Sequence, residues 1–130
     1  MLGQLERSGE FVIADLEAGV GNINRMAANA VDALFVIVEA TPKSIEVGQR
    51  AMAVAAERNV APVRVIANKI RSADDLRMIR DAFGGVDAVV VVPEDVEVLA
   101  ADQRGRSVMD TRPPSPAVTV LSGVARSLWA

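Results

Sequence analysis

Residues 31–70, VDALFVIVEATPKSIEVGQRAMAVAAERNVAPVRVIANKI, decide the fold class. The segment contains two short apolar runs rich in Val and Ile, at Ala33–Glu39 and Val63–Asn68. Between them, Thr41-Pro42 predicts a helix start, because Thr caps free N–H groups and Pro fits the first helical turn. A strand, a helix and a second strand form a crossover unit, which places both strands parallel in one sheet.

The same alternation continues on both sides of this unit. Another apolar run, Phe11–Asp15, precedes it, and Val86–Val92 follows it. Helical spacing with capping residues predicts three further helices, starting at Ser72, after Pro93 and at Ser115. Continuously apolar runs indicate strands buried on both faces. We therefore expect an α/β fold, with a mainly parallel sheet of about four strands between two layers of helices.

The composition fits one such domain over residues 1–130 and excludes several functions. Hydrophobic residues make up 51% of the chain but aromatic residues only 3%, so the predicted core is aliphatic. The net charge of −3, without a basic block, argues against direct nucleic-acid binding. The chain has no Cys and no His, which excludes disulfides and most transition-metal ligands. No apolar run is long enough to span a membrane and no signal core is visible, so we expect a cytoplasmic protein.

Ligands of parallel α/β sheets bind at the carboxyl ends of the strands, which makes Asp15 the first candidate. A carboxylate there can hold Mg²⁺, directly or through water. Gly19, four residues later, would let the backbone approach a terminal phosphate. The simpler alternative is a turn-forming Asp with Gly19 shaping the loop, and the spacing alone favours that alternative.

Two further strand ends carry polar residues. The Asn68 amide can hydrogen-bond a purine edge, and the stem of Lys69 can pack on the ring. Alternatively, both residues only begin a polar loop. After Pro93, the acids Glu94 and Asp95 suit the start of a helix, where the helix dipole favours negative charge, and need no ligand.

The order and spacing of these segments resemble the MinD/ParA-like ATPases, in particular the branch that matures nickel carbon monoxide dehydrogenase. The resemblance runs from about Leu5 to Leu128. LERSGEFVIADLEAG (5–19) resembles the second-switch strand of the family. Residues 31–51 resemble the next strand and helix of the family, and residues 63–70 resemble its base-binding strand. Residues 89–110 resemble its late Pro-x-Asp strand end.

The resemblance implies ATP and Mg²⁺ as cofactors. Asp15 would then serve the Mg²⁺ and water side of the active site, and Gly19 would sense the γ-phosphate. Asn68 and Lys69, with Pro93 nearby, would line the base pocket. A protein of this family acts as a dimeric switch, so a nucleotide and a second subunit are the implied partners.

The chain departs from the family in one decisive way, because no G-x-x-x-x-G-K-[ST] motif occurs in it. The phosphates would lack the nest of backbone N–H groups and the Lys that hold them. In the family, the missing strand lies between the strand that ends at Asp15 and the strand Ala33–Glu39, which leaves a vacant position in the sheet. We therefore expect a fragment that cannot hydrolyse ATP alone and needs a homodimer or a complementing N-terminal half. The branch also binds metal through paired Cys, which this chain lacks, so nickel handling is not assigned to its residues.

Two alternatives from other functional classes remain. A non-enzymatic pseudo-ATPase, serving as a dimerisation or regulatory module, would retain the base-pocket half without turnover. A receiver-like regulatory domain would need a cluster of acids and a phosphorylatable Asp at strand ends. Glu39 ends the second predicted strand and no Asp ends the third or fourth, which disfavours the receiver.

Overall fold

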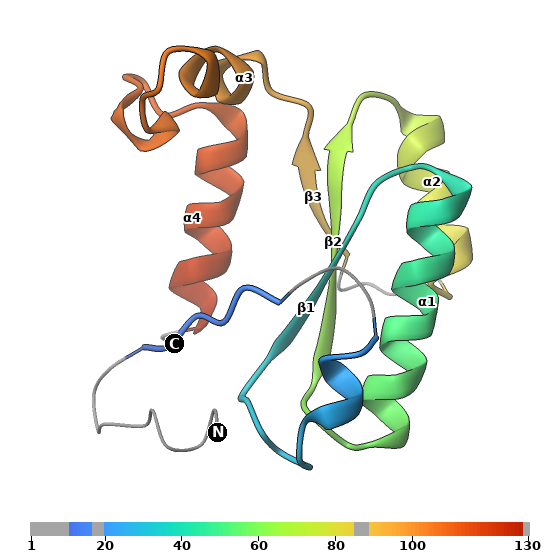
Figure 1. The fold of residues 1–130 in the computed structure, drawn as a ribbon. Coiled ribbons are helices and arrows are strands. Elements are labelled where there is room, and N and C mark those ends of the chain that lie inside the picture. The colour runs from blue at the N-terminus through green and yellow to red at the C-terminus, as the bar shows by residue number, and fades with distance from the viewer. Residues whose placement is uncertain (1–10, 17–19, 85–88, 129–130) are drawn as a thin grey trace.

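A parallel sheet of three strands organises the chain. In the computed structural model, the strands β1 (Leu34–Val38), β2 (Val63–Ile70) and β3 (Val89–Pro93) lie in the order β1-β2-β3, with β2 in the centre. The predicted α/β class is confirmed, since helices flank this parallel sheet (Figure 1). The structure describes residues 11–16, 20–84 and 89–128.

The helices form a layer on each face of the sheet. On one face lie α1 (Pro42–Glu57) and α2 (Ala73–Ala82), while α4 (Pro116–Leu128) packs against β3 on the other (Figure 1). The short helix η2 (Ile23–Arg25) packs beside α1, and α3 (Val96–Gln103) and η3 (Val108–Asp110) connect β3 to α4. None of the helices in the described ranges combines the length and apolar character needed to cross a membrane.

The main core lies between the sheet and α1. Leu34, Val36 and Val38 alternate along β1 with their side chains buried on this face. Gly48 allows α1 to approach closely, because a Cβ there would lie 2.5 Å from a Val38 methyl carbon and 3.0 Å from the Phe83 ring. The intervening residue Ile37 points to the opposite face and is 62% exposed.

The predicted start of α1 is confirmed. The Thr41 hydroxyl accepts a hydrogen bond from the Ser44 N–H at 3.2 Å, and Pro occupies the first turn. The helix ends where Asn59 takes a left-handed conformation with φ of 52°. The Val60 N–H then bonds the Ala55 carbonyl at 3.0 Å, which caps the last turn.

The predicted strand Phe11–Asp15 is wrong. Residues 11–16 have no regular secondary structure, and Ile13 is 95% exposed. A β-branched run becomes a strand only beside a hydrogen-bonding neighbour. The resemblance places another strand between this run and β1, and no described segment fills that position. The sheet therefore holds three of the four predicted strands.

Candidate functional site

The carboxyl ends of all three strands lie at one edge of the sheet, at the top in Figure 1. Asn68 and Lys69 lie near the end of β2, and Ile70 pairs with Pro93 at the end of β3. The Glu94 N–H donates to the Ile70 carbonyl at 3.0 Å. The structure thus brings three of the five predicted site residues, Asn68, Lys69 and Pro93, to adjacent strand ends.

The end of β2 is irregular at the two residues predicted to contact a base. The β2–β3 register shifts between Ala67 and Ile70, which is a bulge that includes Asn68 and Lys69. Lys69 has φ of +54°, in the left-handed region. This conformation costs a non-glycine residue about 1–2 kcal/mol. Bulges and strained residues of this kind cluster at functional sites.

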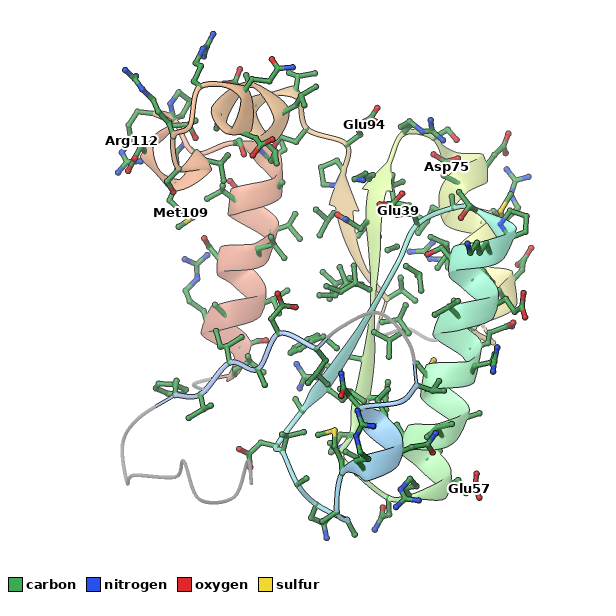
Figure 2. All side chains as sticks on the ribbon, viewed as in Figure 1. Glu39, Glu57, Asp75, Glu94, Met109 and Arg112 are labelled. Atoms are coloured by element: carbon green, nitrogen blue, oxygen red, sulfur yellow. The ribbon has the colours of Figure 1, made fainter. Side chains whose placement is uncertain are left out.

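An ion pair joins this bulge to the neighbouring strand. The Lys69 Nζ lies 2.7 Å from the Glu39 Oε1, with the two side chains 60% and 43% exposed. The Glu39 N–H donates to the Ser44 Oγ at 2.9 Å, and the Thr41 N–H donates to the Glu39 carbonyl at 2.8 Å. Figure 2 shows Glu39 at the same edge of the sheet as Glu94. An ion pair this exposed adds at most about 1 kcal/mol to the stability of the fold. Its main effect is to set the position of the Lys69 side chain.

Asp95 fixes the elements that follow β3. Its carboxylate accepts hydrogen bonds from the Glu97 N–H at 3.0 Å and from the Ala117 N–H at 2.9 Å. The Ala117 N–H, assisted by the Ser115 hydroxyl, holds the pKa of Asp95 below its usual value. The sequence predicts only the helix-start role, because the second bond reaches 22 residues along the chain. Asp95 therefore joins the starts of α3 and α4 and is engaged structurally.

Asp15 is exposed and lies in the segment 11–16, which is drawn in blue below the carboxyl edge of the sheet in Figure 1. In that view the segment does not reach the end of β2, which carries Asn68, and Gly19 lies outside the described residues. The roles of Asp15 and Gly19 in Mg²⁺ and phosphate binding stay predictions. The described residues contain no group of three or more metal-ligating side chains. A lone Asp15 is still compatible with Mg²⁺, which keeps several waters and takes one or two carboxylates beside nucleotide phosphates.

A small cavity of about 180 Å³ lies between α3 and η3, away from the bulge. It is smaller than the ~300 Å³ at which small-molecule pockets begin. Its wall combines residues of α3, η3 and the loop segments beside them: Glu97, Ala101, Arg104, Arg106, Ser107, Asp110 and Thr111.

Comparison with known proteins supports the resemblance. The chain is 31% identical over 109 residues to the carbon monoxide dehydrogenase accessory protein CooC of Rhodospirillum rubrum, covering 84% of this chain and 41% of the relative. It is 29% identical over 102 residues to an uncharacterized ATP-binding protein of Methanocaldococcus jannaschii, covering 76% and 39%. A second uncharacterized ATP-binding protein of that organism is 26% identical over 110 residues, covering 81% and 43%. No family model matches the chain. The chain spans about two-fifths of the length of these curated relatives.

Proposed function

We propose that this chain, a homologue of a carbon monoxide dehydrogenase accessory protein and of ATP-binding proteins, is one part of an ATPase of the MinD/ParA type. It would bind and hydrolyse ATP with Mg²⁺ only when a phosphate-binding segment completes it. The observation that carries the proposal is the strained bulge at Asn68 and Lys69, beside Pro93, at the carboxyl edge of a parallel sheet.

The proposed roles follow the chemistry of these side chains. The Asn68 amide donates to and accepts from the purine edge, the Lys69 stem packs on the ring, and Pro93 adds an apolar wall. Asp15 serves Mg²⁺ and the attacking water, and Gly19 contacts the terminal phosphate. The role of Asp15 requires the segment 11–16 to move to the carboxyl edge when the completing segment joins the sheet.

The missing motif limits what the chain does alone. Phosphoryl transfer depends on positioning and on stabilising charge, which the phosphate-binding loop and its Lys supply. The sequence has no G-x-x-x-x-G-K-[ST] to provide either. The chain alone therefore lacks the contacts that supply most of the affinity for ATP.

The name of the Rhodospirillum rubrum relative suggests a purpose for the switch. We extend the proposal to maturation of a metal-containing enzyme, with ATP turnover controlling delivery or assembly. This chain has no Cys or His, so the metal would be bound by residues of another segment or protein.

A chimera tests the proposal. The 109-residue matched region of the Rhodospirillum rubrum protein is replaced by this chain, and Mg·ATP binding and hydrolysis are measured. The chimera should turn over ATP, Asp15→Asn should abolish turnover, and Asn68→Ala should weaken ATP binding. Calorimetry on the isolated chain should show no sub-millimolar binding. Tight binding by the isolated chain, or a folded chimera without turnover, contradicts the proposal.

The absent phosphate motif also favours a second candidate, a pseudo-ATPase that serves as a dimerisation or regulatory module. The same chimera separates the two, because the module predicts a folded protein that never hydrolyses ATP. It also predicts a stable dimer of the isolated chain in sedimentation experiments.

A further inference from the structure

The residue at position 69 is unusual for its backbone conformation. Among the described non-glycine residues, only Asn29, Asn59 and Lys69 have positive φ. Asn tolerates the left-handed region because its short side chain bonds locally, whereas Lys gains nothing there. An observed strain at a predicted site points to a use for the side chain that offsets it.

Glu39 determines where that side chain lies. Its carboxylate holds the Lys69 ammonium at 2.7 Å, across from β2 to the end of β1. The Glu39 main chain is itself fixed at both its N–H and its carbonyl, by Ser44 and Thr41. The Lys69 stem is therefore drawn along the carboxyl edge of the sheet.

The pairing also changes what Lys69 can bind. A phosphate placed near the ammonium would also meet the Glu39 carboxylate, and the two interactions oppose each other. The ion pair leaves the Lys69 stem available, because its methylene groups still offer apolar surface to a flat ring. The Glu39–Lys69 ion pair therefore favours binding of a base at Lys69 over binding of a phosphate.

We propose that Glu39 is a positioning residue for nucleotide recognition, which presents the Lys69 stem to a purine base and keeps the Lys69 charge from phosphates. This inference rests on the proposed function, because it assigns the base side of the same site.

The test uses the ¹⁵N-labelled chain with two probes, adenosine and inorganic pyrophosphate, followed by amide chemical shifts. Millimolar adenosine should shift the amides of residues 68–70, and pyrophosphate should leave them unchanged. Glu39→Gln should weaken the adenosine response about threefold, as expected for loss of an exposed ion pair. It should also admit pyrophosphate at Lys69, which a merely structural role would not predict.

Two substitutions at position 69 complete the test. Lys69→Arg keeps a stem and a cation for Glu39 and should retain the adenosine response, whereas Lys69→Ala should lose it. The control is Asp74→Asn, which breaks the exposed Asp74–Arg77 pair on α2 and should change neither response.

The inference is overturned if adenosine leaves residues 68–70 unshifted. It is also overturned if pyrophosphate binds there in the unaltered chain, or if Glu39→Gln behaves like Asp74→Asn. If one of these results were found while the chimera still hydrolysed ATP, the proposed function would hold and only the role of Glu39 would be rejected.

Discussion

At the scale of single residues, Gly48 decides how closely α1 approaches the sheet. We expect Gly48→Ala to lower the free energy of unfolding by about 1–3 kcal/mol, the range for overpacking a core. The reason is the 2.5 Å approach of the new methyl group to Val38. The matched control is Gly123→Ala on α4, where nothing lies within 4 Å. It should stabilise by roughly 0.5–1 kcal/mol through helix propensity. Urea denaturation measures both, and equal effects would contradict the packing argument.

A substitution at Lys69 should stabilise the fold and weaken adenosine binding at the same time. Lys69→Asn places a residue that tolerates the left-handed region at φ of +54°. We expect a rise in the free energy of unfolding of up to about 1 kcal/mol, because relief of strain exceeds the loss of an exposed ion pair. The same variant should lose the adenosine-induced shifts. Urea denaturation and amide shifts report the two effects, and a variant that is less stable than the parent would show that the conformation is not strained.

The role of a single residue is predictable from the sequence only where its interaction partner lies a few residues away. The Thr41 cap follows from the sequence, because its partner lies three residues away. Asn68 and Lys69 are polar residues after an apolar run, which suffices to place them near the carboxyl end of a strand. Glu39 was missed as a partner of Lys69, because 30 residues separate them and the ion pair depends on the β1–β2 register.

At the scale of elements, Asp95 makes the attachment of α4 sensitive to acid. The folded-state pKa of Asp95 lies below its ordinary value of 3.8 because of the Ala117 N–H. The stabilisation is therefore fully present above the unfolded-state pKa and is lost as the pH falls through the folded-state pKa. Hydrogen exchange should show α4 losing protection in this acid range before α1 does.

Asp95→Asn should remove this acid dependence. The amide oxygen can replace one hydrogen bond but not the ionised carboxylate, so α4 should exchange faster at neutral pH and change less on acidification. Asp74→Asn, at an exposed position on α2, is the control. If the variant kept the same acid response as the parent, Asp95 would not be the group that titrates.

Element starts were more predictable than strand pairing. Ser72 accepts from the Asp75 N–H at 3.1 Å, as its position three residues before an acid predicts. The Asp75 carboxylate, however, accepts from the Arg71 N–H, one residue before the Ser72 N–H that a capping box would use. Phe11–Asp15 failed for a different reason: composition shows that a segment suits a sheet, but only a neighbouring strand makes it one.

At the scale of the whole molecule, the alternating pattern sufficed to predict a parallel α/β sheet, because burial on both faces leaves a continuous apolar run. The pattern does not specify which neighbours cover the sheet. On the face opposite α1, α4 packs against β3, and Ile37 on β1 stays 62% exposed. Parallel sheets are normally covered on both faces, so this face is only partly built in the described residues.

Ile37 therefore tests whether the chain is completed at β1. We expect Ile37→Thr, which keeps a β-branched side chain, to change the stability of the isolated chain by less than ~0.5 kcal/mol, as for a surface substitution. In the ATPase chimera, a completing strand and its helix should bury this position. The same change should then cost roughly 1–2 kcal/mol, by loss of apolar burial. Urea denaturation of both proteins, with the exposed α2 substitution Met78→Thr as control, gives the two values. Equal costs in chain and chimera would show that the completing segment does not cover β1.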